Sequence, residues 1–120
     1  MTAHPEGTTL ATDRALLIRC KEHLRNVAKY AEGGRGEFMG SPICQDAILW
    51  NLQMACLCAE LVSAEERQRH SAVDWRRLRS LAKGLVDDEM RPNLEDVWEL
   101  AEVHVPELRR QLGLLLTARV

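Results

Sequence analysis

The sequence predicts an all-α fold, arranged as an antiparallel up-and-down four-helix bundle that forms a dimer. The chain has only 7 Gly, 4 Pro, one Phe and one Tyr, too few turn and strand residues for a many-stranded sheet. Four stretches carry apolar residues at helical spacing, and mostly short connections join them, as in an antiparallel bundle. The second stretch is apolar almost all the way round, which indicates a partner surface beyond its own bundle.

Length and composition favour one globular domain. The 120 residues suit a single core, and 46% hydrophobic with 28% charged residues is a globular balance. Lys and Arg number 16 against 18 Asp and Glu, so the net charge of −2 does not by itself indicate nucleic-acid binding. Residues 1–11 have no apolar period, and we expect a flexible tail there, followed by one helical domain over residues 12–120.

The first two helices are expected over residues 12–32 and 42–62. Thr12 is a suitable N-cap for the first, whose apolar residues recur every three or four positions until the Gly33-Gly34 pair ends it. A glycine-rich loop should follow. The Ser41-Pro42 pair, an N-cap before a proline at the first helical position, marks the start of the second helix.

The third helix is expected over residues 72–86, because Trp75, Leu78, Leu81 and Leu85 fall on one side of it. Just before it, residues 63–66 have the spacing of a capping box, but a wholly polar stretch follows. We therefore expect a turn or a short exposed helix between the second and third helices.

The fourth helix, expected over residues 93–117, has the clearest pattern. Its apolar residues alternate steps of four and three, the seam of coiled-coil-like packing: Leu94, Trp98, Ala101, Val105, Leu108, Leu112 and Leu115. Pro106 interrupts this helix and should bend it, because the carbonyl of Glu102 loses its hydrogen-bond donor.

Export, membrane insertion and metal binding are not expected. Residues 1–13 lack the basic and apolar regions of a signal peptide, so a cytoplasmic location is expected. A membrane span over residues 43–62 would place five polar side chains in hydrocarbon. Cys20 and His23 form only half of a zinc site, and the run Asp87-Asp88-Glu89 is more typical of a solvated turn than of a magnesium site. We therefore expect no metal and no cofactor, and the cysteines should be buried thiols.

Three segments resemble one known family. Residues 45–52, QDAILWNL, are similar to the second-helix signature of the HepT toxins, which belong to the HEPN ribonuclease superfamily. Residues 73–78, VDWRRL, resemble that family's entry to its third helix. Residues 94–100, LEDVWEL, followed by VPEL, resemble its fourth. The order and spacing of these segments imply a HEPN-like helical bundle over nearly the whole chain after residue 12.

The family's functional motif is absent from the matching stretch. That motif is an Arg, a polar residue, a few apolar positions and then His-x-Tyr. Alignment on Trp75 and Trp98 without a gap places Ala82 at the Arg, Lys83 at the polar residue, Asp87 at the His and Glu89 at the Tyr. An imidazole suits activation of a ribose 2′-hydroxyl because its pKa lies near the working pH, whereas a carboxylate is a weaker base.

The resemblance implies a partner as well as an activity. HepT toxins pair with a minimal nucleotidyltransferase antitoxin called MntA, which adds AMP to the motif tyrosine and blocks the ribonuclease. With that acceptor missing, we expect a catalytically degenerate homodimer that binds or regulates a partner, with a nucleotidyltransferase as the candidate. The alternatives are a divergent ribonuclease that cleaves RNA with Asp87 or Glu89 and Lys83, or an acidic turn that docks a different protein. The expected dimer contacts are Ile43, Ala47, Trp50 and Met54, and the expected RNA or partner contacts are Arg76, Arg79 and Lys83.

Overall fold

Helices are the main secondary structure in the part of the chain that the structure describes. The computed structural model describes the backbone of residues 6–118 and the side chains of residues 12–118; within them it contains helices, turns and an isolated β-bridge, but no strand. The elements are α1 (Glu6–Tyr30), α2 (Gly34–Gly40), α3 (Pro42–Leu61), α4 (Ala64–Arg69), α5 (Trp75–Leu78), α6 (Leu94–Glu99), the π-helical segment η1 (Leu100–His104) and α7 (Val105–Thr117). The predicted all-α class is confirmed.

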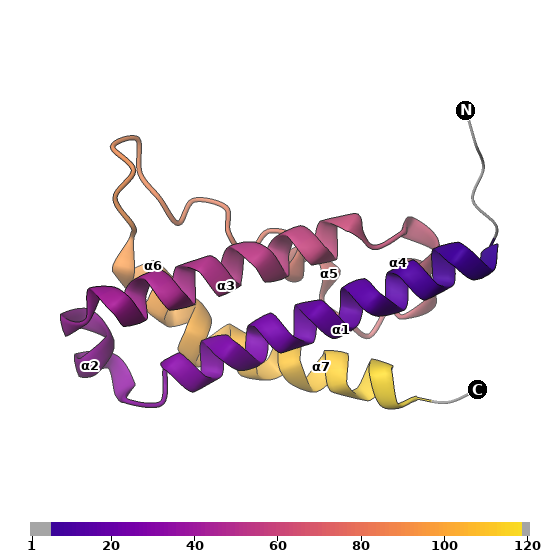
Figure 1. The fold of residues 1–120 in the computed structure, drawn as a ribbon, viewed down its shortest axis with the longest axis horizontal. Helices are drawn as coiled ribbons and strands as arrows, with labels where there is room; N and C mark the ends of the chain where they lie inside the picture. The colour runs from indigo at the N-terminus through magenta and orange to yellow at the C-terminus, as the bar shows by residue number, and fades with distance from the viewer. Residues whose placement is uncertain (1–5, 119–120) are drawn as a thin grey trace.

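Helices α1, α3 and α7 form the body of an elongated molecule, whose extents are 48 × 32 × 20 Å. Helix α1 packs against both α3 and α7. Figure 1 shows α3 and α7 running opposite to α1, with α2 making the turn between α1 and α3 at one end of the body. Among residues 6–118, no helix has the length and apolar character needed to cross a membrane.

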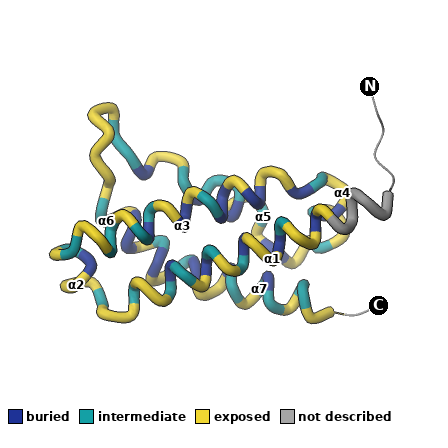
Figure 2. Tube along the Cα trace, viewed as in Figure 1, coloured by how far each residue is buried: buried dark blue, intermediate teal, exposed yellow. Residues whose placement is uncertain are grey.

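The core lies where α1 faces α3 and α7, as the buried positions in Figure 2 show. Buried side chains recur every three or four residues on each helix, which places them along one inward face. On α1 and α3 they include Leu17, Cys20, Leu24, Val27, Ile48, Leu52, Ala55 and Ala59. The predicted seam of the fourth helix is confirmed from Trp98 to Leu112, with Leu94 and Leu115 partly buried at its ends.

Serine caps start α3 and α4. The Ser41 hydroxyl accepts a hydrogen bond from the backbone N–H of Cys44 at 3.2 Å, and Pro42 follows at the first helical position, so the predicted start of this helix is confirmed. The Ser63 hydroxyl accepts from the backbone N–H of Glu66 at 3.2 Å. Of the two alternatives expected here, a turn or a short helix, the structure shows the short helix α4. Both caps satisfy donors that the first turn of a helix leaves unpaired.

Helix α1 begins earlier than expected. It already includes residues 6–11, so the prediction that Thr12 caps the first helix is wrong. The neighbouring Asp13 is 2% exposed and binds Ser63 instead of serving the start of its own helix. Of the predicted flexible tail, residues 1–5 lie outside the described residues.

The segment after Gly33 is a helix and not the expected loop. Gly34, with a φ of +89°, makes the turn out of α1, and α2 follows directly. Phe38 is buried with its ring 5.3 Å from that of Trp98, which ties α2 to α6. The Gln45 side-chain amide donates to the carbonyls of Phe38 at 2.9 Å and Met39 at 3.0 Å, so the last turn of α2 gains a partner from α3.

The predicted third helix over residues 72–86 is wrong. Helix α5 ends at Leu78, and turns follow it. The Ser80 hydroxyl donates to the Arg76 carbonyl at 2.8 Å, competing with helical hydrogen bonding, and Gly84 adopts a left-handed φ of +75°. Leu81 and Leu85 are nevertheless buried. The apolar spacing therefore predicted correctly which residues lie in the core, but it did not predict the backbone conformation. Within the described residues this leaves three long helices, and a four-helix bundle is not confirmed.

The predicted fourth helix is interrupted close to Pro106. Its span is divided into α6, η1 and α7. Because Pro106 has no N–H to donate to the carbonyl of Glu102, the preceding turn cannot close with regular α-helical bonds, and the chain widens into a π-helical segment. The helical path changes direction there (Figure 1).

Candidate functional site

The positions aligned with the family motif lie in, or just before, a projecting hairpin, residues 86–92, which we call the acidic hairpin. Its base is closed by a bridge between Val86 and Pro92. Asn93 strengthens that base: its backbone N–H donates to the Leu85 carbonyl and its side-chain amide to the Gly84 carbonyl, both at 2.8 Å. Figure 1 shows this loop standing clear of the helices. The motif positions are therefore on a protruding turn and not at the end of a helix.

Asp87 organises the acidic hairpin from within. Its Oδ1 accepts hydrogen bonds from the backbone N–H groups of Glu89 and Arg91, both at 2.9 Å. Its Oδ2 accepts from Nε of Arg91 at 3.1 Å, and the Arg91 guanidinium also pairs with Glu89. The backbone N–H of Asp87 donates to the Arg91 carbonyl at 2.8 Å. Both oxygens of the Asp87 carboxylate are thus engaged inside the loop.

These hydrogen bonds change the chemistry of Asp87. The backbone N–H of Arg91 is the largest cause that holds the pKa of the Asp87 carboxyl below its usual range, and the backbone N–H of Glu89 and the Arg91 side chain add to it. A general base works best with a pKa near the working pH, and this shift moves Asp87 further from it. Asp87 is a structural carboxylate in this arrangement.

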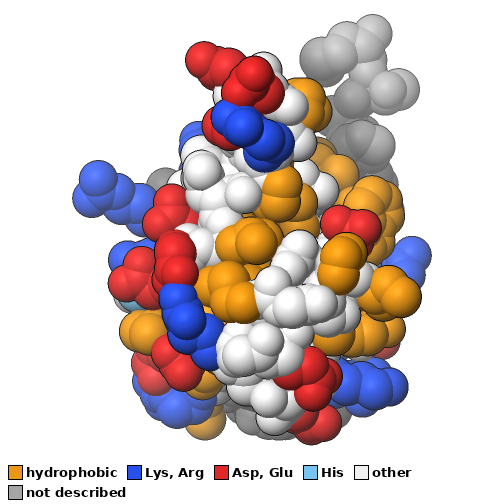
Figure 3. All heavy atoms as spheres, turned by 90° about the vertical axis from the view of Figure 1, so that its left-hand side faces the viewer, with side chains coloured by type: hydrophobic (Ala, Val, Ile, Leu, Met, Phe, Trp, Pro, Cys, Tyr) orange, Lys and Arg blue, Asp and Glu red, His pale blue; other side chains and the backbone are white. Residues whose placement is uncertain are grey.

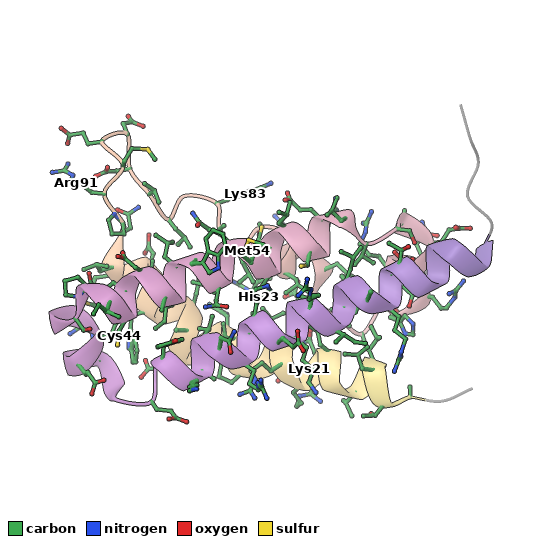
Figure 4. The ribbon with its side chains drawn as sticks, in the orientation of Figure 1. Lys21, His23, Cys44, Met54, Lys83 and Arg91 are labelled. Carbon is green, nitrogen blue, oxygen red and sulfur yellow. The ribbon has the colours of Figure 1, made fainter. Side chains whose placement is uncertain are left out.

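The four predicted motif positions are not gathered into one site. Ala82 is half-buried against the core, whereas Lys83 and Glu89 are exposed. In Figure 4, Lys83 lies well away from Arg91, which is paired with both Asp87 and Glu89 at the hairpin. Met90 at the hairpin tip is 80% exposed with a φ of 64°, a feature that no sequence pattern indicated.

An apolar stripe runs along the outer face of α3. The four predicted dimer contacts lie on it: Ile43 is 79% and Trp50 58% exposed, and Ala47 and Met54 are half-buried between them. Two further residues, Leu57 and Leu61, continue the stripe with 46% and 61% exposure. The six positions alternate steps of four and three residues, which is the spacing of a coiled-coil seam. Figure 3 looks at the end of the body where α3 begins and shows hydrophobic side chains in a band bordered by charged ones.

The predicted basic contacts meet around one hollow. Arg76, Arg79 and Lys83 line it together with Arg67 on α4, Trp75, Ser80 and Glu60, and its volume is about 610 Å³. Sequence reasoning missed Arg67, because it lies in a polar segment with no pattern linking it to α5. We call this feature the cationic hollow.

A polar cluster lies between α1 and α3. Asn51 is 6% exposed; its Oδ1 accepts from the Asn26 side-chain amide at 3.2 Å and lies 2.9 Å from Nδ1 of His23. Its own side-chain amide donates to the Ala47 carbonyl at 2.8 Å. Figure 4 shows His23 between the two helices. The cluster satisfies a buried amide that would otherwise destabilise the interface.

The prediction that the cysteines are buried thiols is confirmed for three of the four. Cys20, Cys56 and Cys58 are buried free thiols, and Cys44 is partly buried. The Cys20 thiol donates to the Ala55 carbonyl at 3.4 Å, and burial is the main cause that raises the pKa of Cys20. In the region with described side chains, no three His, Cys, Asp or Glu residues are grouped so that they could hold a metal ion.

The comparisons with known proteins identify similarity to ribonucleases. A family model described as "Ribonuclease HepT-like" matches residues 20–115. A curated protein named "Putative RNase TTE0752", from Caldanaerobacter subterraneus subsp. tengcongensis, is 24% identical over 80 residues, which cover 67% of this chain and 71% of that protein. No solved structure matches the chain significantly.

Proposed function

Because the chain belongs to the family of HepT-like ribonucleases, we propose that it is a catalytically degenerate member that acts as a dimeric binding or regulatory partner. The observation that carries the proposal is the state of Asp87, which occupies the motif histidine's position. Both of its carboxylate oxygens are held by groups within the acidic hairpin. It is neither an imidazole nor a carboxylate free to accept a proton from a ribose hydroxyl.

The other two motif positions support the same conclusion. Ala82 has no charge with which to bind a scissile phosphate, and it is partly buried against the core. Glu89 has no phenol to accept AMP. The segment between His70 and His104 contains no histidine or tyrosine, so a shift of the alignment by a few residues supplies no substitute.

Dimerisation is proposed through the apolar stripe of α3. An exposed row that includes Ile43, Trp50 and Leu61 at coiled-coil spacing is costly on an isolated monomer and typical of a helix-helix interface. A two-fold pairing would bring the same face of each copy together. The α1 and α3 helices of both copies would then make a four-helix arrangement, which residues 6–118 of a single copy do not supply.

The proposed partner beyond the dimer is a minimal nucleotidyltransferase of the MntA type. Glu89 stands at the position where the family carries the AMP-accepting tyrosine, and it is exposed on a projecting loop. The Glu89 carboxylate, which pairs with Arg91, would take the place of the negative charge of the modified tyrosine. On this view the protein is held permanently in the silenced form and can engage a partner without being modified.

RNA cleavage by the unaltered dimer is the deciding measurement. We expect no cleavage above that of the Asp87→Ala, Glu89→Ala double variant, and no AMP transfer to the chain by a purified minimal nucleotidyltransferase. A triple variant with Ala82→Arg, Asp87→His and Glu89→Tyr rebuilds the motif and should gain AMP acceptance, cleavage or both. If the unaltered chain cleaves RNA as well as the rebuilt one, and the double variant loses that activity, the protein is a divergent ribonuclease instead.

A further inference from the structure

We propose that the cationic hollow is a binding site for phosphate groups, carried either by a single-stranded nucleic acid or by a free nucleotide. Its lining includes Arg67, Arg76, Arg79 and Lys83, against the single acidic side chain of Glu60. This concentration of positive charge contrasts with a chain whose net charge is −2. The site uses neither Asp87 nor Glu89, and it requires no catalysis.

The cations of the hollow differ from most other arginines on the nearby helices in their ion pairing within the described residues. Arg69, Arg77, Arg91 and Arg110 each pair with a carboxylate on the same or a neighbouring turn. Among the described residues, none of the four cations of the hollow makes an ion pair within 4.0 Å, although Glu60 lines the same space. Charged groups kept close together and without counter-charges attract an anionic ligand.

Two of these arginines have a buried donor without a partner among the described residues. The Nε–H groups of Arg67 and Arg79 are buried and have no acceptor among the described residues. Most buried donors are paired, and an unpaired one is unfavourable. Arg67 and Arg79 come from different elements, α4 and the turn after α5, so tertiary packing and not a surface charge run brings them together. A phosphate in the hollow would bind the guanidinium N–H groups that line it, not these buried Nε–H groups.

The anchoring of the hollow gives it a defined shape. The Cys56 thiol donates to the Arg79 carbonyl at 3.2 Å, which fixes the backbone of this arginine to α3. The indole N–H of Trp75 donates to the His70 carbonyl at 2.9 Å, which fixes the ring that lines the hollow. The volume of about 610 Å³ falls in the usual range of ligand pockets. An ordered aromatic side chain beside cations is the combination that binds nucleotide phosphates and bases.

The test is the affinity for a short fluorescent single-stranded RNA, followed by anisotropy at about 50 mM salt. An Arg67→Gln, Arg79→Gln double variant should bind roughly tenfold more weakly, with a shallower salt dependence. The matched control is Arg69→Gln, Arg110→Gln, which removes the same charge from ion-paired arginines outside the hollow and should bind as the unaltered chain does. ATP and inorganic tripolyphosphate serve as unlabelled competitors.

Competition by both ATP and tripolyphosphate would mean that the hollow recognises phosphate from either source. Competition by neither, with RNA binding still sensitive to the double variant, would assign it to nucleic acid. Glu60→Gln provides a check that misfolding cannot imitate, because Glu60 is exposed: it should tighten binding roughly threefold. The proposal is overturned if none of the three probes binds, if both double variants bind equally well, or if Glu60→Gln leaves the affinity unchanged.

Discussion

Asp13 on α1 accepts two hydrogen bonds from Ser63, the residue that caps α4. Its Oδ1 lies 2.9 Å from the Ser63 backbone nitrogen and its Oδ2 lies 2.6 Å from the Ser63 hydroxyl, and the Asp13 side chain is almost fully buried. One carboxylate therefore joins the first helix to the turn between α3 and α4. The same Ser63 hydroxyl accepts from the backbone of Glu66, so the contact also orders the cap.

Replacing Asp13 should destabilise the protein strongly. Asp13→Ala leaves two donors of Ser63 without their acceptor, and we expect a loss of about 3 kcal/mol in the free energy of unfolding. Asp13→Asn keeps one acceptor oxygen and should lose about half as much. Urea unfolding measures both. The control is Asp88→Ala, an exposed carboxylate, which should change the free energy by less than about 0.5 kcal/mol. Equal effects of Asp13→Ala and Asp88→Ala would contradict the contact.

The carboxyl pKa of Asp87 should be measurably low. Carbon NMR of the folded protein should give a pKa below the ordinary value of 3.8, chiefly because the backbone N–H of Arg91 donates to the carboxylate. In concentrated urea the pKa should return to the ordinary value. Because the folded pKa is the lower one, this carboxylate contributes stability above the ordinary pKa and loses it as the pH falls through the folded pKa. A folded pKa at or above 3.8 would revive Asp87 as a candidate base.

Trp50→Glu should separate the dimer into monomers. The substitution places a charge in the middle of the apolar stripe of α3, and we expect the dissociation constant to rise roughly 30-fold or more. Because Trp50 is 58% exposed in the single chain, the monomer should keep its fold. Sedimentation velocity measures the association, and circular dichroism the helix content.

Leu114→Glu is the matched control for this interface. Leu114 is 59% exposed on α7, outside the stripe, and its replacement should leave the association unchanged. A chain that sediments as a monomer before any substitution would remove the basis of the proposed dimer.

Two residues just before or within the acidic hairpin, Gly84 and Met90, have a left-handed φ, and their substitutions should change the stability in opposite directions. Gly84→Ala places a side chain at a φ of +75° and should cost about 1 kcal/mol in stability, although no neighbour lies within 4 Å of the added carbon. Met90→Gly relieves a φ of 64° and should gain about 0.5 kcal/mol. Gly36→Ala, in α2 and without a left-handed φ, should be stabilising. If the alanine variants of Gly84 and Gly36 shift the urea midpoint in the same direction, the backbone conformations described for these two glycines are contradicted.

The elements that sequence predicted well are those fixed by neighbouring residues. Ser41 and Pro42 mark the start of α3 because a cap and a proline act within one turn. The turns that follow Leu78 could not be predicted, because Leu78, Leu81 and Leu85 show helical spacing whether a helix or a series of turns places them in the core. Sequence spacing reports which residues are buried more reliably than it reports the backbone that buries them.

The parts of the candidate site also differ in whether neighbouring residues or tertiary packing determine them. The apolar stripe was predictable, since α3 carries more apolar residues than one interface needs, and Ile43 and Trp50 are indeed exposed. The cationic hollow was predictable only on its α5 side. Arg67 joins Arg79 through tertiary packing, and the hydrogen bonds that occupy Asp87 depend on the shape of a loop, so neither has a signature in the sequence.

The buried Asn51 determines which way α3 is turned about its own axis. A helix that is apolar nearly all round could rest on α1 in several rotational settings at similar hydrophobic gain. In the observed setting, the Oδ1 of Asn51 meets Asn26 and His23 on α1. A rotation of one residue step would separate that oxygen from both partners, although the hydrogen bond from the Asn51 amide to Ala47 within α3 would remain. One polar side chain thus selects the setting that leaves Trp50 facing outward. An Asn51→Leu substitution would keep the helix buried while removing the means by which it chooses its outer face.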